Sequence, residues 1–361
     1  MNEIFLIIFF ISLLLFLLGS GVWVALSMIA VSAVGMFLFT TRPVGDAMAT
    51  TIWGTSSSWT LTALPLFVWM GEILFRTKLS ENLFKGLSPW LSKLPGGLIH
   101  VNVVGCGLFA AISGSSAATV ATVGKMSIPE LRKRKYPEKI LLGSLAGSGT
   151  LGLLIPPSII LIIYGVTIED SIAKLFMAGI FPGIMLAIIF MIYVVVWSVL
   201  NKSQMPKITE NFSFLEKIKK SKQLLPVVLL ISAVIGSIYT GIATATEAAS
   251  LGVVGALTLS LFQGTLNKNT FKLSLLGATK TSCMIAFILA GSTFLSLAMG
   301  FTGLPRNLAI WIQELNLSPY MLIFILTIFY IILGMFLDGI SAVVLTMAII
   351  EPMIRQAGFD M

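Results

Sequence analysis

Charged residues are scarce in this chain, and so are cysteine and histidine. Lysine, arginine, aspartate and glutamate make up 11% of its 361 residues, while 57% are hydrophobic. A soluble protein of this length carries more charge on its surface, so the composition indicates a helical membrane protein. The two cysteines exclude a disulfide framework, and the single histidine excludes a zinc site built from several histidines.

Long apolar runs predict an all-α polytopic protein that crosses the membrane several times. The expected spans are 4–18, 22–40, 60–76, 138–165, 175–200, 225–242, 248–266 and 272–299. The first run follows Met1-Asn2-Glu3, which carries no basic residue, and no A-x-A cleavage pattern comes after it. We therefore interpret this run as a retained span rather than a secretory signal peptide.

Two further apolar runs, 98–128 and 319–354, are each interrupted by a short polar segment that contains glycine. Ser113-Gly114-Ser115-Ser116-Ala117 interrupts the first run, and Asp338-Gly339-Ile340-Ser341-Ala342 interrupts the second. Lipid tolerates such a break only where protein or a water-filled cavity surrounds it. Each run is therefore predicted to be a re-entrant hairpin, in which two half-helices meet at a tip.

Paired breaks of this kind are typical of transporters that are built from inverted repeats. We expect one repeat at 1–200, a polar cytoplasmic linker at 201–223 and a second repeat at 224–361. Short matching pairs support this division, because Met70-Gly71 in the first half recurs as Met299-Gly300 in the second.

Most of the 23 lysines and arginines lie on one side of the predicted topology. They fall in the connections 76–97, 125–139, 201–223 and 267–272, which the positive-inside rule places in the cytoplasm. The first hairpin then enters from the cytoplasm and the second from the opposite side, on which the N-terminus also lies. Topology alone explains the basic residues, so we expect no nucleic-acid partner.

The first tip combines the groups that bind ions in broken membrane helices. Ser113, Gly114, Ser115 and Ser116 are candidate Na⁺ ligands, because a helix that ends presents carbonyl oxygens and serines add hydroxyls. The second half-helix begins here, and the partial positive charge of its N-terminus suits a carboxylate. The alternative is a face of small residues on which helices pack closely.

A glycine-rich segment from Gly147 to Ser158 ends in two adjacent prolines within the 138–165 run. It contains G-x-G-x-x-G, but no soluble βαβ unit surrounds it, so we do not interpret it as a dinucleotide-binding loop. A continuous helix over this run would be roughly 42 Å long against a core of about 30 Å, and interior prolines break helices. We predict an unwound helix whose free carbonyls bind a cation and a polar substrate, with a structural kink as the alternative. The candidate Na⁺ ligands are Gly149, Thr150, Gly152 and Pro156.

Acidic residues inside membrane segments are costly to bury and usually functional. Asp338 lies at the second tip, where it either binds an ion or substrate, together with Gly339 and Ser341, or caps the half-helix that starts there. Three glutamates nearer the span ends are interpreted as caps or interface anchors: Glu72, Glu247 and Glu351.

The substrate is expected where the ions bind. Its candidate contacts are Ser116, Thr119, Pro157, Ser158 and Asp338. We expect neither catalytic residues nor an organic cofactor. An intramembrane serine hydrolase would need Ser115 or Ser116 beside His100, and no nucleophile-elbow pattern surrounds either serine. A purely structural subunit would leave the polar breaks unexplained.

Four segments resemble the large (M-type) membrane subunit of TRAP transporters, the tripartite ATP-independent periplasmic family. They are Ala63-Leu64-Pro65-Leu66-Phe67-Val68-Trp69-Met70-Gly71-Glu72, the tip from Ser113 to Gly124, Gly149 to Ser158 with its Ile-Pro-Pro-Ser, and Thr246-Glu247-Ala248-Ala249. The resemblance implies an elevator-type transporter in the bacterial inner membrane, with a periplasmic N-terminus.

The same resemblance implies the transport reaction and its partners. It implies Na⁺-coupled import of small carboxylates or sulfonates that a soluble periplasmic substrate-binding protein (P-type) delivers. It also implies a small four-helix membrane subunit (Q-type) as a partner. The alternative is a Na⁺/dicarboxylate symporter or an ion antiporter of related architecture that needs no binding protein.

Two further expectations concern a missing C-terminal span and the separation of the two membrane subunits. The second-half counterpart of the unwound segment should begin beyond Met361, so we expect this sequence to lack a final span or two. No four-helix segment precedes residue 1, so we expect the two membrane subunits to be separate chains.

Overall fold

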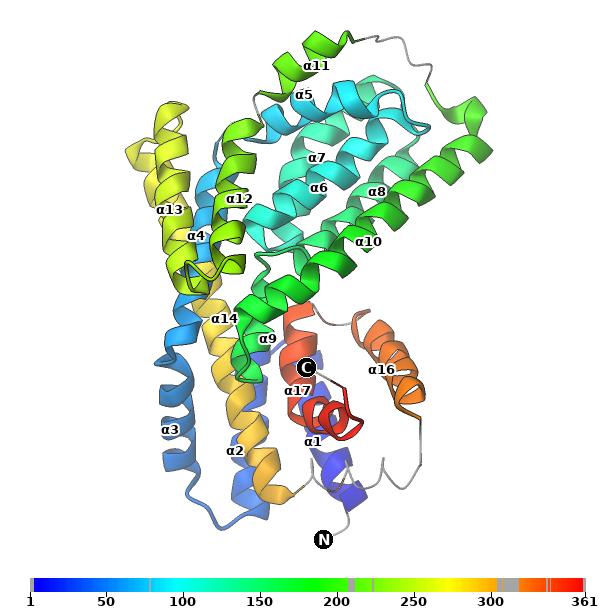
Figure 1. The fold of residues 1–361 in the computed structure, drawn as a ribbon. Coiled ribbons are helices and arrows are strands. Elements are labelled where there is room, and N and C mark those ends of the chain that lie inside the picture. The colour runs from blue at the N-terminus through cyan, green and yellow to red at the C-terminus, as the bar shows by residue number, and fades with distance from the viewer. Residues whose placement is uncertain are drawn as a thin grey trace. The chain divides into compact units, whose positions relative to one another are not determined.

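The structure is a computed structural model of the chain. It describes residues 3–77, 79–206, 212–222, 224–303, 307, 318–335, 337 and 339–359. All regular secondary structure in these residues is helical, as expected for an all-α protein (Figure 1). The chain divides into two compact units that interleave along the sequence: unit 1 (Met1–Leu61, Ile163–Glu169 and Cys283–Met361) and unit 2 (Thr62–Ile162 and Asp170–Ser282).

Unit 1 contains the N-terminal helices and the C-terminal part of the chain. Its helices are α1 (Glu3–Gly19), α2 (Val24–Phe39), α3 (Val44–Ser56), α16 (Pro319–Leu333), α17 (Gly339–Gln356) and the second part of α14 (Lys268–Thr302). Helix α14 approaches α2 so closely that a Cβ on Gly291 would lie 2.8 Å from the carbonyl oxygen of Ala25. The Ser292 hydroxyl donates to the carbonyl oxygen of Val344 at 2.6 Å and so joins α14 to α17.

Unit 2 contains the first polar tip and the Pro-Pro segment. Its helices are α4 (Ala63–Phe75), α5 (Leu79–Leu91), α6 (His100–Ser113), α7 (Ser116–Lys133), α8 (Glu138–Gly149), α10 (Ile172–Leu200), α11 (Phe214–Ser221), α12 (Leu225–Tyr239), α13 (Ala245–Phe262) and the first parts of α9 (Ile159–Thr167) and α14. Short 3₁₀ segments are η1 (Trp59–Thr62), η2 (Gly97–Ile99), η3 (Thr150–Leu153) and η4 (Lys202–Gln204).

Helix α6 lies at the centre of unit 2. It packs against α4, α5, α7, α8 and α10 (Figure 1). The apolar core around it includes Val101, Leu131, Leu141 and Leu151, all of which are buried. Since α6 leads directly into the first tip, this core fixes the position of the tip within the unit.

Helix lengths and exposed side chains match a membrane protein. In the described residues, α10, α13 and α14 are each long and apolar enough to cross a bilayer, and three further bent pairs qualify if each pair is one span. Helix α10 exposes large apolar side chains along its length, such as Phe181, Ile184 and Ile188. Contiguous exposed apolar surface of this kind is suited to lipid contact.

The predicted spans correspond to helices, and the described residues form three further helices outside them, α3, α5 and α11. Helix α3 is not predicted by the apolar runs, because Asp46, Thr50 and Thr51 interrupt its apolar residues. The threonine hydroxyls bond back to the helix itself, since both donate to the carbonyl oxygen of Ala47 or Asp46. Such back-bonding lets a helix carry polar residues without exposing free hydroxyls to lipid.

Candidate functional site

The first predicted break lies between α6 and α7. Helix α6 ends at Ser113, and Gly114 adopts the left-handed conformation (φ +58°), which suits a residue without a Cβ. Ser115 is the N-cap of α7, and its hydroxyl accepts a hydrogen bond from the backbone N–H of Ala118. The helical interruption expected at 113–116 is therefore confirmed.

Hydroxyl groups cluster at this tip. The hydroxyl oxygens of Ser113 and Thr119 lie 2.9 Å apart, and the Thr119 hydroxyl donates to the carbonyl oxygen of Ser115 at 2.8 Å. The Ser116 hydroxyl is buried, and no described residue forms a hydrogen bond with it. A buried hydroxyl without a partner is unusual, because leaving it unpaired costs about 1–3 kcal/mol.

The second predicted break lies between α8 and α9. Helix α8 ends at Gly149 and passes through the 3₁₀ turn η3, and residues 154–158 are not helical before α9 begins at Ile159. The buried Ser158 hydroxyl donates to the carbonyl oxygen of Leu153 at 2.7 Å and closes the irregular segment on itself. The predicted unwinding at 147–158 is therefore confirmed for its second part, since α8 continues through Gly149.

The two breaks meet in space. The backbone N–H of Ile159 donates to the carbonyl oxygen of Gly114 at 3.2 Å. A Cβ on Gly114 would lie 2.8 Å from the carbonyl oxygen of Pro157, and a Cβ on Gly152 would lie 3.0 Å from the backbone nitrogen of Ser116. Glycine at both positions therefore allows the two backbones to approach directly.

A cavity of about 290 Å³ opens beside the tip, within unit 2. Ser113 and Ser115 line it from the tip, Ala117 from the first turn of α7, Glu72 from α4 and Thr281 from α14. Pockets for small molecules usually measure about 300–1,000 Å³, so this one suits a small solute. The cavity thus places polar tip atoms and a carboxylate around one space.

Glu72 is a residue that the sequence interpretation assigns to a cap or an interface anchor, and the structure places it in the cavity wall instead. Its carboxylate accepts a hydrogen bond from Arg76, one helical turn later, at 2.8 Å. A Cβ on Gly277 would lie 2.6 Å from the same carboxylate, so α14 packs directly over it. The spacing of Glu72 and Arg76 by four residues within one apolar helix is the sequence feature that could have revealed this pair.

The backbone dipoles at this place favour an anion. Helices α7 and α9 both begin at the breaks, at Ser116 and Ile159, and helix N-termini carry partial positive charge. The Glu72 carboxylate, which opposes this charge, is neutralised by Arg76. Among the described residues, no group of three or more His, Cys, Asp and Glu side chains meets, so an ion at the tip would be held by neutral oxygens.

The sequence of the chain matches one protein family along almost its whole length. The profile of the family described as "Tripartite ATP-independent periplasmic transporter, DctM component" matches residues 10–361. The chain belongs to this family. Membership, together with the apolar helices, identifies a bacterial membrane protein that is a TRAP large permease subunit.

Three relatives illustrate the range of the family. The C4-dicarboxylate TRAP transporter large permease protein DctM of Pseudomonas aeruginosa is 32% identical over 87% of this chain and 73% of its own length. The protein of the same name in Rhodobacter capsulatus is 30% identical over 98% of this chain and 83% of its own length. The sialic acid TRAP transporter large permease protein SiaM of Vibrio cholerae is 30% identical over 95% of this chain and 80% of its own length.

Two of the segments that carry the TRAP resemblance, on α4 and at the tip, supply residues that line the cavity. The third, Gly149 to Ser158, ends directly before Ile159, which also lines it. The fourth contains Glu247, which forms a capping box with Thr244 at the start of α13, and α13 packs along α4. The interpretation of Glu247 as a cap is confirmed.

The remaining candidate residues of this TRAP subunit are not among those that line the cavity, or fall outside the residues that the structure describes. Thr150 is exposed, and its hydroxyl donates to the carbonyl oxygen of Gly147 at 2.7 Å. Gly339 and Ser341 begin α17 in unit 1. Asp338 lies outside the residues that the structure describes. Its role at the second tip stays a prediction.

The TRAP subunit does not bring His100 beside Ser115 or Ser116. His100 is the first residue of α6, and thirteen residues of helix, roughly 20 Å, separate it from the end of that helix at Ser113. Its Nε2 atom lies 2.8 Å from the carbonyl oxygen of Pro95. This separation is incompatible with a hydrolytic pair of His100 with Ser115 or Ser116.

Proposed function

We propose that the chain is the permease of a Na⁺-coupled importer of small organic anions in the bacterial inner membrane. The proposal rests on one observation, the meeting of the two helix breaks beside the 290 Å³ cavity. The alternative of a transporter without a binding protein shares this geometry, so the experiment below tests both.

The tip supplies the kind of ligands that Na⁺ prefers. Carbonyl and hydroxyl oxygens of Ser113, Ser115 and Thr119 lie within hydrogen-bond distance of one another, and hard cations bind such oxygens. The unpaired, buried Ser116 hydroxyl supports an ion there, because an ion would satisfy an atom that no described residue satisfies. Na⁺ is the cargo that drives transport in this proposal.

The substrate class follows from the charge of the cavity and from the relatives. The N-termini of α7 and α9 favour a carboxylate or sulfonate. The relatives are named for C4-dicarboxylates and for sialic acid, which are organic acids. We infer that the anionic group of the substrate lies near Ala117, at the first turn of α7.

The helix lengths support a re-entrant hairpin and an elevator mechanism. Helices α6 and α7 have 14 and 18 residues, roughly 21 and 27 Å, so each is shorter than a hydrocarbon core of about 30 Å. A hairpin of this length ends inside the membrane, where a moving domain can carry its tip and cargo across. The soluble binding protein and the small four-helix subunit complete the tripartite system in this proposal.

Substitution of one serine tests the ion site. We expect Ser116→Ala to raise the Na⁺ concentration for half-maximal uptake about tenfold, since a polar contact to a charged group contributes about 1.5 kcal/mol. Ser127→Ala is the matched control, because Ser127 lies on the same helix and also has a buried, unpaired hydroxyl, but is about three helical turns beyond the tip. Uptake is measured in liposomes that contain both membrane subunits, with the binding protein outside.

The outcomes separate the alternatives. Uptake of succinate, sialic acid and isethionate is measured separately. Each substrate is tested with a Na⁺ gradient and, as the control, with a K⁺ gradient. Uptake that ignores the Na⁺ gradient would contradict the coupling. Uptake that proceeds without the binding protein would favour the independent symporter. Equal Na⁺ dependence of the two serine variants would place the ion elsewhere.

A further inference from the structure

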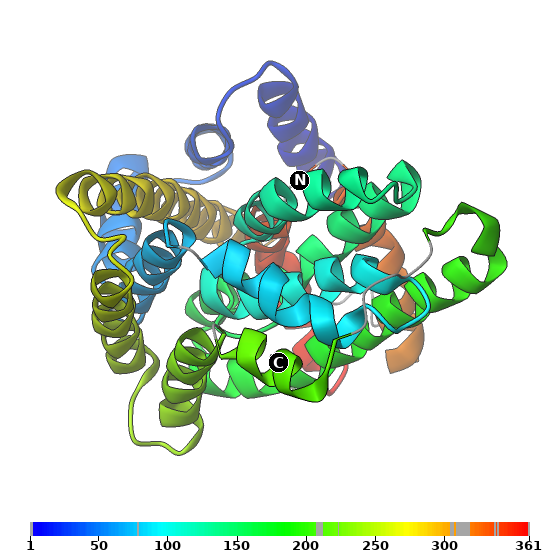
Figure 2. The same ribbon diagram turned by 90° about the horizontal axis from the view of Figure 1, so that it is seen from above.

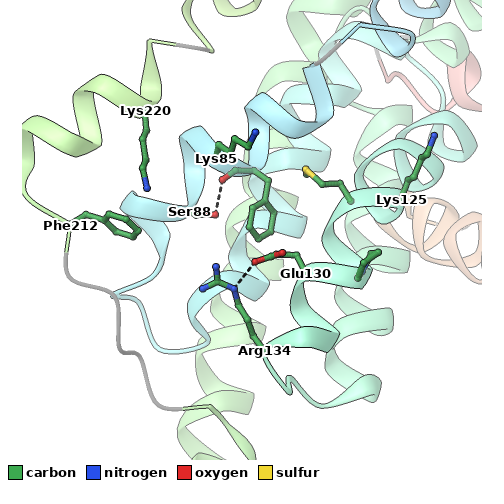
Figure 3. A pocket seen from close by; sticks show the side chains of 10 residues that line it. Lys85, Ser88, Lys125, Glu130, Arg134, Phe212 and Lys220 are labelled. Atoms are coloured by element: carbon green, nitrogen blue, oxygen red, sulfur yellow. Dashed lines mark hydrogen bonds and ion pairs between the residues drawn. The ribbon is translucent and has the colours of Figure 1, made fainter.

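A second pocket of unit 2, with a volume of about 530 Å³, lies at the far end of α7 from the tip (Figure 3). Helices α5, α7 and α11 and the turn that follows α7 form its walls. Among the described residues, its lining carries four basic side chains, Lys85, Lys125, Arg134 and Lys220, and one carboxylate, Glu130. The pocket therefore has an excess of positive charge.

The Glu130 carboxylate is already engaged. Glu130 accepts a hydrogen bond from Arg134 at 2.9 Å, which neutralises one of the four cations. The Lys220 ammonium lies 4.1 Å from the ring centroid of Phe212, a contact that orients its charge beside the pocket. Lys125 is exposed on α7, and the described residues provide no carboxylate partner for it. Among the described residues, Lys125 and Lys220 thus have no carboxylate partner in the pocket.

Helix α11, which supplies Lys220, is strongly amphipathic. It begins with a capping box of Ser213 and Glu216, so this short helix is well defined at its start. Phe214, Leu215 and Ile218 are exposed at 67%, 78% and 42%. An eight-residue helix with a basic face and large exposed apolar side chains is typical of segments that lie in a membrane interface.

Helix α11 is held against α5 in a fixed position. The Trp90 indole of α5 donates to the Ser221 hydroxyl at 2.7 Å, and the Trp90 and Phe214 rings pack edge to face at 6.2 Å. Both views show α11 running alongside α5 (Figures 1 and 2). Helix α11 therefore holds both Lys220 of the pocket and the exposed apolar side chains at a fixed place on unit 2.

We propose that this pocket binds the phosphate of an acidic phospholipid, whose acyl chains lie against the exposed apolar residues of α11. A dianionic or monoanionic phosphate matches the ammonium groups of Lys125 and Lys220, for which the described residues provide no carboxylate. The basic loops are predicted to face the cytoplasm, where anionic lipids attract basic segments next to the membrane. This site is separate from the tip and does not depend on Na⁺ coupling.

The exposed apolar side chains favour a lipid over a free anion. Inorganic phosphate or a soluble organic phosphate would use the lysines alone and would leave Phe214 and Leu215 in contact with water. A phospholipid satisfies both parts of the surface, since its headgroup and its chains lie on the two sides of the interface.

Native mass spectrometry of the intact chain in detergent tests the proposal by titration with phosphatidylglycerol. We expect the double variant Lys125→Gln, Lys220→Gln to bind this lipid about 25-fold more weakly, which is about fivefold for each lysine. The matched control is Lys133→Gln, Lys219→Gln, which removes two charges from the same two helices but outside the pocket lining. Lys125→Arg with Lys220→Arg keeps the charge and should bind nearly as the unmodified chain does.

Three outcomes would overturn the proposal. The first is an equal loss of lipid by the control pair, which would indicate general surface charge. The second is equal binding of zwitterionic phosphatidylcholine. The third is displacement of the lipid by glycerol 3-phosphate at similar affinity, which would assign the pocket to a soluble phosphate. Selective loss in the pocket variant, with rescue by arginine, would support it.

Discussion

Replacing Gly114 by alanine should disable the tip while leaving the rest of the chain folded. Gly114 occupies the left-handed region (φ +58°), and its carbonyl oxygen accepts the hydrogen bond from Ile159 that joins the two breaks. An added Cβ would lie 2.8 Å from the carbonyl oxygen of Pro157 and 2.9 Å from the backbone nitrogen of Ile159. Both are backbone atoms, which cannot rotate away.

The free-energy cost of Gly114→Ala at the tip has two contributions. The left-handed conformation costs about 1–2 kcal/mol for a residue with a Cβ. Moving Ile159 aside weakens a hydrogen bond whose net contribution is about 1 kcal/mol. Together these costs amount to about 2–3 kcal/mol, which reduces the population of the native tip about 30- to 150-fold relative to a displaced tip.

Two other glycines separate the causes. Gly264 has the same kind of backbone (φ +67°) but nothing within 4 Å of an added Cβ, so Gly264→Ala carries the strain without the clash. Gly143 lies within α8 with open space around it, so Gly143→Ala carries neither. We expect Na⁺-dependent uptake in liposomes to fall at least tenfold for Gly114→Ala and to change less than twofold for both controls.

Normal uptake by Gly114→Ala would refute the reasoning, because the contact between the two breaks would then be irrelevant to transport. A loss in Gly264→Ala as large as that in Gly114→Ala would also refute it, since backbone strain anywhere would suffice. Size-exclusion chromatography and thermal melting of each purified variant confirm that the chain is folded before uptake is compared.

Two further predictions concern the cavity wall and α13. Arg76→Gln leaves the Glu72 carboxylate unpaired in the cavity, so we expect the KM for an anionic substrate to rise about tenfold. The KM should not rise in Glu72→Gln or in the variant that carries both changes. A higher KM in the double variant would show that Arg76 itself binds the substrate. Thr244→Ala removes the capping box at the start of α13 and should destabilise the protein by about 1 kcal/mol, whereas Thr244→Ser should not. Thermal melting measures the difference. Equal melting temperatures of the alanine and serine variants would contradict the role of Thr244 as a cap.

The helix breaks could be predicted because their causes are local. A left-handed glycine followed by a serine N-cap ends one helix and begins the next, and adjacent prolines cannot continue a helix. These effects depend on residues within one turn of each other, so composition and spacing revealed them. The apolar runs predicted most other helices for the same reason. They did not predict α3, whose threonines hide its helical character, nor α5 and α11, which lie in the predicted polar connections.

The convergence of the breaks could not be predicted, because it depends on packing between distant segments. Gly114 and Gly152 each present bare backbone to the other break, and nothing in the local sequence specifies which backbone they meet. Glu72 was assigned to a span end for a related reason. Its place in the cavity wall depends on the packing of α4 against the tip, where a Cβ on Gly71 would lie 3.0 Å from the Cα of Ser113.

The hydrogen bond between Ile159 and Gly114 has a thermodynamic consequence. Because it ties the start of α9 to the end of α6, neither backbone can shift without the other. A ligand that orders one of them lowers the entropic cost of ordering its neighbour, and such assistance is mutual by necessity. If one ligand bound at α9 increases the affinity of the α6 end for a second ligand by some factor, the second ligand increases the affinity for the first by the same factor.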